Sequence, residues 1–200
     1  MKLSILIPTV TGREKSFNQI EDFLQWQISQ ASLWDKVEVL SLCDNKELSI
    51  GAKRNKLLEM ANGDFCVMID DDDTVHFQFI ERIMSAIESN PDCVGYKELC
   101  IYENGSVKSS DISLKHKRWN EPKNAGFNHY RSPFYKVPIK TELCRMVGFK
   151  DLRYGEDIEF ANRIIKLLTN EVYIDEFMYI YRYKEENHNQ KYGIKTSVTA

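Results

Sequence analysis

Apolar runs alternate with amphipathic segments through about the first ninety residues of this chain, and this alternation constrains the fold most strongly. Residues 3–7, 37–42 and 65–69 are short apolar runs with the length of buried strands. The segment after the first run places apolar side chains such as Ile20 and Leu24 at helical spacing. Parallel strands need crossover connections, which helices usually supply. The pattern therefore predicts an α/β fold in which helices flank a mostly parallel sheet.

Boundary signals predict where the next helices lie. Ser49 is a suitable N-cap for a helix over about residues 50–61, and the Asn62-Gly63 pair favours its end. Residues 77–89 form a second amphipathic segment, which stops before Pro91. Both helices follow apolar runs, so each completes a strand–helix unit of the predicted sheet.

The second half of the chain is less regular. Residues 94–102 followed by Asn104-Gly105 predict a hairpin, because Asn-Gly favours a type I′ turn. Residues 106–128 are polar with little periodicity, which predicts a long active-site loop. A helix is expected over residues 157–168, and an aromatic-rich strand over residues 172–183. This half is expected to form a smaller mixed sheet.

Composition limits the class of protein. The 200 residues carry a formal net charge of -3 and are 42% hydrophobic, which suits one compact domain over 1–200 and argues against binding nucleic acid through overall charge. No stretch approaches the roughly 20 apolar residues of a membrane span, so no membrane span and a cytoplasmic location are expected. The five cysteines include no C-x-x-C pair and are expected to be reduced.

The run Asp70-Asp71-Asp72-Asp73 directly follows the third apolar segment, at the edge where parallel sheets bind ligands. Adjacent carboxylates repel by about 1 kcal/mol per pair at 4 Å in water, so the run needs a countercharge. Carboxylate oxygens suit Mg²⁺ or Mn²⁺, which commonly bridge to substrate phosphates. The alternative is a solvated loop in which Asp73 or Thr74 caps the following helix.

A second acidic group opens the helix predicted near residue 157. Gly155 precedes Glu156 and Asp157, and acids in a first helical turn are favoured by the helix dipole, so simple capping explains them. Together with an acidic metal site earlier in the chain, the same pattern makes Asp157 a candidate general base that takes a proton from a hydroxyl group.

Several segments in order resemble the landmarks of family 2 glycosyltransferases of the GT-A fold. These segments are Ile5-Leu6-Ile7-Pro8-Thr9, Ile50-Gly51-Ala52-Lys53-Arg54-Asn55, Ala61-Asn62-Gly63-Asp64-Phe65, Ile69-Asp70-Asp71-Asp72-Asp73 and Gly155-Glu156-Asp157. The resemblance implies inverting transfer of a sugar from a nucleotide diphosphate sugar, with UDP as the expected carrier, to a hydroxyl of a glycan or other acceptor. It also implies a donor-binding half over about residues 1–105 and an acceptor-binding half over about 106–200.

The resemblance further implies roles for individual residues. Nucleotide-sugar contacts are expected from Pro8, Thr9, Asp44, Gly51, Lys53, Asp70 and Asp71. The D-x-D motif falls on Asp70-Asp71-Asp72, with Asp72 on the metal, although four identical residues leave open which one holds it. His188 is a weaker candidate near the metal, against the alternative of an exposed histidine. Contacts to the sugar or acceptor are candidates for Trp119, His129 and Glu156, against a surface aromatic, a loop histidine and a capping acid.

Two other classes of function remain open at the sequence level. An apolar strand followed by Asp70-x-Asp72-x-Thr74-Val75 also fits a haloacid-dehalogenase-type phosphohydrolase, in which Asp70 would be the nucleophile. A carbohydrate-binding domain without turnover is the other. A calcium-binding EF-hand loop fits poorly, because the sixth position from Asp70, which such a loop reserves for glycine, holds Val75. No residue pattern in the sequence identifies the donor sugar, the acceptor or the oligomeric state. The chain is compatible with being part of a longer protein.

Overall fold

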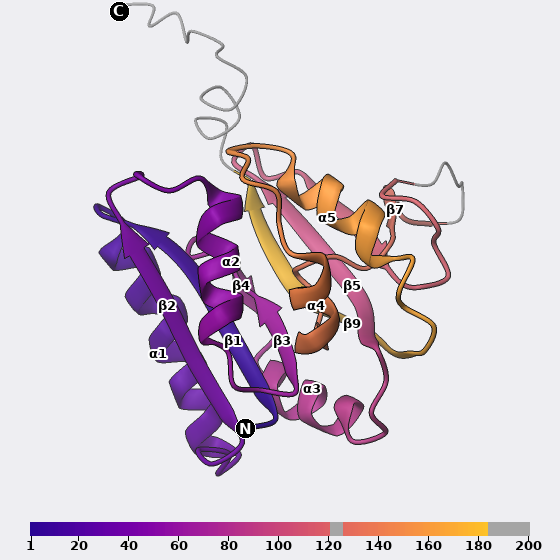
Figure 1. Ribbon diagram of the computed structural model, residues 1–200, viewed down its shortest axis with the longest axis horizontal. Helices are drawn as coiled ribbons and strands as arrows, with labels where there is room; N and C mark the ends of the chain where they lie inside the picture. The colour runs from indigo at the N-terminus through magenta and orange to yellow at the C-terminus, as the bar shows by residue number, and fades with distance from the viewer. Residues whose placement is uncertain (121–125, 184–200) are drawn as a thin grey trace, which may run out of the picture.

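The predicted parallel strands form the N-terminal side of the sheet (Figure 1). In the computed structural model, which describes residues 1–120 and 126–183, β1 (Leu3–Val10) lies between β2 (Val37–Asp44) and β3 (Phe65–Met68). It pairs in parallel with both neighbours. Seven of its eight residues are buried, as expected for a central strand covered on both faces. The three strands consequently end at one edge of the sheet.

Six further strands continue this sheet within the described residues. They are β4 (Thr74–Val75), β5 (Cys93–Tyr102), β6 (Val107–Ile112), β7 (His129–Arg131), β8 (Ile139–Lys140) and β9 (Glu171–Tyr183). The short strand β8 joins the two sides, since it pairs antiparallel with both β3 and β5. On the far side β5 pairs antiparallel with β6 and parallel with β9. The smaller mixed part is therefore continuous with the parallel part.

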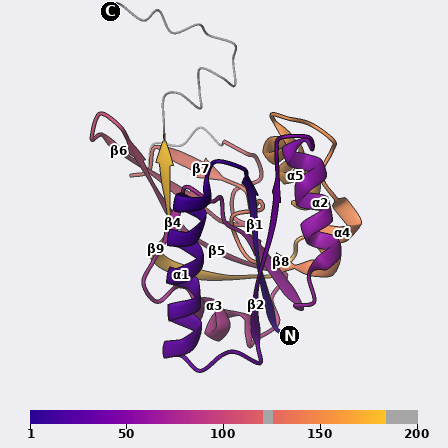
Figure 2. The ribbon, with the colours of Figure 1, turned by 90° about the vertical axis from the view of Figure 1, so that its left-hand side faces the viewer.

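Helices cover both faces of the sheet (Figure 2). They are α1 (Glu14–Gln30), α2 (Ile50–Met60), α3 (Phe79–Ile87), α4 (Thr141–Val147) and α5 (Glu156–Ile164). Helices α1 and α3 contact each other on one face, while α2, α4 and α5 pack in sequence on the other. Their buried side chains join the strands in one hydrophobic core. The predicted α/β class with a mostly parallel sheet is confirmed, and the division into halves near residue 105 stays a prediction.

The second half differs from the sequence prediction in two places. The hairpin is confirmed, because β5 and β6 pair antiparallel around a turn in which Gly105 has φ of 78°. The predicted loop over 106–128 is wrong for residues 107–112, which form β6. The polar side chains of β6 hide the strand from an apolar pattern, while its backbone pairs with β5. Helix α4 was not predicted either. The five cysteines are free thiols, as expected.

Candidate active site

The ends of β1 and β3 border a cavity of about 380 Å³, here called the strand-end cavity. Pro8 and Thr9 reach it from β1, and the aspartates that follow β3 form another wall. Basic side chains complete the lining, among them Arg13 and Lys46. The cavity lies where doubly wound sheets bind their ligands, as the strand order requires.

The four aspartates differ in exposure. The Asp70 and Asp72 side chains are 24% and 10% exposed, whereas those of Asp71 and Asp73 are 2% and 0% exposed. The run forms a turn in which the Asp73 backbone N–H donates to the Asp70 carbonyl oxygen at 3.1 Å. Asp70, Asp71 and Asp72 all line the cavity, and Asp70 and Asp72 are the more exposed of the three.

Asp71 links the acidic run to β1. Its Oδ2 accepts a hydrogen bond from Thr9 Oγ1 at 2.6 Å, and its Oδ1 accepts one from Arg13 Nη1 at 2.6 Å. Burial raises the pKa of Asp71 above its usual range, although both partners oppose the shift. Arg13 also lies 3.4 Å from Asp72 Oδ2. Asp71 therefore fixes one wall of the cavity and the position of Arg13.

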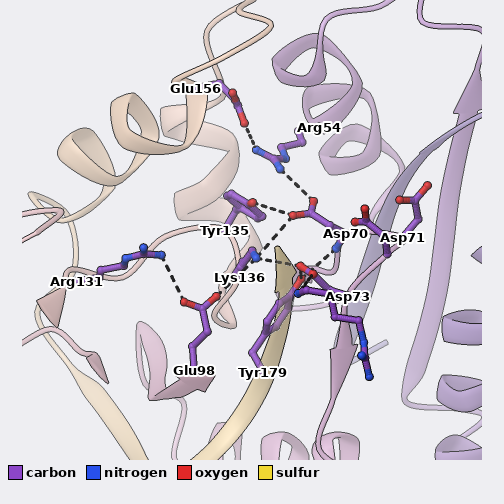
Figure 3. A network of polar contacts seen from close by, with 12 residues as sticks. Arg54, Asp70, Asp71, Asp73, Glu98, Arg131, Tyr135, Lys136, Glu156 and Tyr179 are labelled. Carbon is purple, nitrogen blue, oxygen red and sulfur yellow. Dashed lines mark hydrogen bonds and ion pairs between the residues drawn. The ribbon is translucent and has the colours of Figure 1, made fainter. Parts of the chain in front are cut away.

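Asp70 is held from three directions (Figure 3). Arg54 Nη2 lies 3.2 Å from its Oδ1, while the Tyr135 hydroxyl donates to its Oδ2 at 3.0 Å. The Lys136 ammonium lies 3.8 Å from the same Oδ2. Burial opposes the charge of Asp70, yet Arg54 and Lys136 hold its pKa below the usual value. Asp70 is thus an ionised carboxylate in a fixed orientation.

Asp73 belongs to the protein interior. Its Oδ2 accepts hydrogen bonds from Tyr179 at 2.7 Å and Lys136 at 3.0 Å, and its Oδ1 accepts one from the Arg182 backbone N–H at 2.9 Å. Burial, together with the nearby charge of Asp70, raises the pKa of Asp73 to about 7, against the effect of Lys136. Asp73 ties the acidic run to β9 and does not line the cavity.

Two predicted nucleotide contacts have other positions. The Lys53 ammonium contacts Asp44 and the Thr9 carbonyl oxygen, so it lines the cavity while Asp44 stands behind it as its partner. Burial opposes ionisation of Asp44, but the Lys53 hydrogen bond lowers its pKa. Gly51 faces away from the cavity. A Cβ there would lie 1.9 Å from the Lys150 carbonyl oxygen, so this glycine serves the close approach of α2 to the segment before α5.

A second cavity of about 330 Å³, here called the α5 cavity, adjoins the first. The residues that line both are Ile50, Asp70, Arg153, Tyr154 and Tyr181. Beyond them, the α5 cavity is lined by Trp119, Arg131, Glu156 and Asp157, among others. Asp70 consequently stands at the boundary between an acidic, cation-lined cavity and one that contains the candidate base.

The two acids that begin α5 have different surroundings. Glu156 is buried and its Oε1 contacts Arg54 Nη1. Burial raises the pKa of Glu156, and Arg54 opposes the shift. Asp157 is half-buried, and its Oδ1 accepts a hydrogen bond from the Ile158 backbone N–H at 2.8 Å. Of the two, Asp157 offers a carboxylate to the cavity, and Glu156 is bound by Arg54.

Residues 20–155, more than half the chain, match the profile described as Glycosyl transferase family 2. The chain belongs to this family. It is 32% identical, over 89 residues, to a glucosyl-dolichyl phosphate glucuronosyltransferase of Haloferax volcanii. The aligned region covers 44% of this chain and 26% of that protein. The predicted family is therefore confirmed, and the phosphohydrolase alternative finds no support.

Solved structures share the fold of this family member. TarS 1-349 of S. aureus in complex with UDP-GlcNAc superimposes with a TM-score of 0.64 at 18% identity, covering 92% of this chain and 59% of that one. TarS 1-349 in complex with UDP gives a TM-score of 0.63 at 18% identity, covering 95% and 63%. At this identity the likeness concerns the fold, and it confirms the GT-A fold. The chain spans less than two thirds of the length of these relatives.

The remaining predicted site residues divide into three groups. Trp119 lines the α5 cavity, with its ring centroid 4.7 Å from that of Phe134. His129 begins β7 two residues before Arg131 and lines neither cavity, whereas Arg131 lines the α5 cavity. His188 lies outside the described residues. Thus only Trp119 of these three is placed at a cavity.

Sequence reasoning missed several residues that line the cavities. The polar ones include Arg13, Lys46, Arg54, Arg131, Tyr135, Lys136, Arg153, Tyr154 and Tyr181. Arg153 and Tyr154 directly precede the Gly155-Glu156-Asp157 motif, and this adjacency was the available signal. Tyr181 belongs to the aromatic alternation of β9, which favours a structural role by itself.

Protein ligands for a metal are limited at this site. No group of three or more His, Cys, Asp or Glu side chains comes together as a metal site among residues 1–120 and 126–183. Any ion in the strand-end cavity would therefore take most of its ligands from substrate or water.

Within the same described ranges, no helix has the length and apolar character to cross a membrane.

Proposed function

We propose that this chain transfers a sugar from a nucleotide diphosphate sugar, with UDP as the carrier, to an acceptor hydroxyl with inversion. The observation that carries the proposal is the pair of adjoining cavities that share Asp70, with Asp72 and basic side chains in one and Asp157 in the other. Transfer requires two substrates to meet at one carbon atom, and two connected cavities provide that arrangement. A cytoplasmic location is part of the same proposal.

The strand-end cavity suits the donor. Arg13, Lys46 and Arg153 bring positive charge to its lining, which favours the diphosphate. Arg153 donates to the backbone carbonyl oxygens of Lys46 and Glu47 at 3.3 and 3.5 Å, so its charge is not neutralised by a carboxylate in these contacts. Pro8, Thr9 and Lys53 form the opposite part of the lining, where we place the nucleoside.

Mn²⁺ or Mg²⁺ is the proposed cofactor, held by the D-x-D pair. Asp72 and Asp70 bring carboxylate oxygens to the same cavity, and such ions are commonly bound by one or two carboxylates plus substrate phosphates. Asp72 is the principal ligand in this proposal, as the resemblance to the D-x-D motif implies, and Asp70 is the second carboxylate of the pair. When bound, the ion would neutralise charge that develops on the departing diphosphate. A role for His188 stays a prediction.

Asp157 is the proposed general base. The acceptor hydroxyl oxygen forms a bond to the anomeric carbon on the face opposite the diphosphate, and the bond between that carbon and the phosphate oxygen breaks. The hydroxyl proton passes to the Asp157 carboxylate, so the products are the glycosylated acceptor and the nucleoside diphosphate. One displacement of this kind inverts the anomeric configuration.

The relatives support the choice of carrier. TarS 1-349 has been solved with UDP-GlcNAc and with UDP, and the Haloferax volcanii relative is named as a glucuronosyltransferase. Because this chain covers only part of each, the donor sugar and acceptor of this protein are not transferred from those names.

The direct test incubates the protein with Mn²⁺ and a panel of nucleotide sugars and measures both donor binding and release of the nucleoside diphosphate. An aryl phosphate hydrolysis assay runs in parallel. We expect one donor to bind in a metal-dependent manner and its nucleotide to be released when an acceptor panel is added. Binding without release in any acceptor mixture would instead support a non-catalytic carbohydrate-binding domain, and phosphate hydrolysis lost in Asp70→Asn would overturn the proposal.

A further inference from the structure

Arg54 on α2 joins two carboxylates that come from distant parts of the chain (Figure 3). Its Nη2 lies 3.2 Å from Asp70 Oδ1, and its Nη1 contacts Glu156 Oε1. The side chain is 3% exposed, so both contacts are shielded from solvent. One guanidinium group thus bridges the donor-side acidic run and the first residue of α5.

Aromatic rings fix the plane of this guanidinium group. Its central carbon lies 3.6 Å from the centroid of the Tyr135 ring and 5.6 Å from that of Phe149. Tyr135 in turn donates its hydroxyl hydrogen to Asp70. A planar, stacked guanidinium group can direct two N–H groups at two partners at once, which a lysine ammonium does less well. The bridge therefore depends on arginine itself.

The start of α5 lies directly beside this bridge. Gly155 precedes the helix with φ of 80°, and no side chain of the described residues caps the helix N-terminus. Further along the helix, Phe160 and Ile164 are buried in the core and hold the body of α5. Asp157 directly follows Glu156, so the contact of Glu156 with Arg54 ties the helix turn that carries Asp157 to the acidic run.

We propose that Arg54 is a positioning residue of the transfer reaction, which through Glu156 holds Asp157 at a fixed place relative to Asp70. This inference rests on the proposed function. Arg54 also places a positive charge near Asp157, and Glu156 places a negative one there. The other charged groups that line the same cavity are Asp70, Arg131, Lys136 and Arg153.

Arg54 and Glu156 carry opposite charges, so removing one or the other should shift the pH dependence of kcat in opposite directions. A general loss of structure would not produce such opposite shifts. Arg54→Met removes the positive charge, so the acid limb of the kcat–pH profile should move to higher pH, by about one unit. Glu156→Gln removes the negative charge and leaves Arg54 in place, so the limb should move to lower pH. Both variants should lose tenfold or more in kcat. Arg54→Lys keeps the charge without the bridge, so kcat should fall while the limb stays near its original position.

Arg163→Met is the matched control. Arg163 lies on the same helix and anchors it through hydrogen bonds to the backbone carbonyl oxygens of Val147 and Gly148, and it lines neither cavity. This variant should lower Tm and leave the acid limb unmoved. Circular dichroism verifies folding, and if Arg54→Met does not fold, the direction of the shift in Glu156→Gln decides. If the wild-type protein transfers sugar, the inference is overturned when the acid limb of the kcat–pH profile stays in place in Arg54→Met and Glu156→Gln, or moves in the same direction in both. A wild-type protein that transfers no sugar overturns the proposed function.

Discussion

The carboxylates that line the strand-end cavity are held differently from Asp157, which lines the α5 cavity. Asp71 accepts hydrogen bonds from two side chains, and Asp70, which lines both cavities, is engaged by Arg54, Tyr135 and Lys136. Asp157 accepts a hydrogen bond from the next backbone N–H, and no ion pair joins it to a cation in the part of the chain that the structure describes.

This difference matches the two tasks that we propose. A group that binds a diphosphate and a metal gains from being fixed before the ligand arrives, because little ordering is then required on binding. A general base must accept a proton, which a carboxylate already bonded to several donors does poorly. The contrast therefore predicts that carboxylates of the strand-end cavity govern donor affinity, while Asp157 governs turnover.

The largest expected effect comes from Asp157→Asn. An amide of the same shape cannot accept the hydroxyl proton, so kcat should fall by about 10²–10⁴-fold. Donor affinity should stay within a factor of two or so, since Asp157 does not line the strand-end cavity. Calorimetric titration of the donor and steady-state kinetics measure the two quantities. Normal transfer by this variant would show that Asp157 is not the general base, and the proposed difference in task between the two cavities would no longer hold.

Asp72→Ala should produce the complementary change. Its carboxylate reaches the strand-end cavity, so its loss should weaken Mn²⁺-dependent donor binding by about 10–100-fold. Titration of donor with and without Mn²⁺ isolates the metal-dependent part. Asp71→Ala is a useful comparison, because that side chain is buried and its loss should lower stability as well. Donor binding that stays equally metal-dependent in Asp72→Ala would reject this residue as the ligand.

The elements around the strand-end cavity were the most predictable from sequence. Apolar runs separated by helical segments leave few arrangements for β1, β2 and β3, and the chain order then forces Asp70 and Asp72 to their shared edge. The α5 cavity was less predictable, because many of its lining residues come from the short strand β7 and from irregular segments around residues 119, 134–136 and 153–154. Arg131 reaches it from a strand of three residues that no periodicity marks.

Long-range contacts explain the particular errors. Gly51 occupies a motif position that resembles a nucleotide contact, yet its backbone N–H bonds the Leu152 carbonyl oxygen at 3.2 Å. Arg13 follows β1 in a turn, and only the folded structure brings it to Asp71. Similarly, Arg54 stands beside Lys53 in sequence, but the two face different carboxylates. Residue type and spacing do not contain this information.

A carboxylate outside both cavities tests whether firm binding alone has functional consequences. Asp92 accepts hydrogen bonds from Thr169, Asn170 and Lys140, and these lower its pKa to about 2, although burial opposes the shift. Asp92→Ala should cost about 1–3 kcal/mol of unfolding free energy and leave kcat and donor affinity unchanged.

The pH dependence of this effect follows from the direction of the shift. Because the folded protein lowers the pKa of Asp92, its stabilising contribution is present above the ordinary value of 3.8 and is lost as pH falls toward 2. Denaturant unfolding of wild type and Asp92→Ala should therefore give curves that converge over this acidic range. A stability difference that persists unchanged there would show that the hydrogen bonds do not act through the ionised carboxylate.

The smallest expected effect concerns the wall opposite Asp157. The Trp119 ring lies against Phe134, and the Arg131 guanidinium carbon is 5.0 Å from its centroid, so the indole has a defined orientation in the α5 cavity. Aromatic contacts of this kind contribute about 0.5–1.5 kcal/mol, which predicts a roughly 2- to 10-fold rise in acceptor KM for Trp119→Ala. Trp119→Phe should restore most of the affinity, and Trp34→Ala, an exposed tryptophan that lines neither cavity, should change nothing. If donor affinity fell instead, Trp119 would serve the strand-end cavity, and the two cavities would not divide binding of donor and acceptor between them.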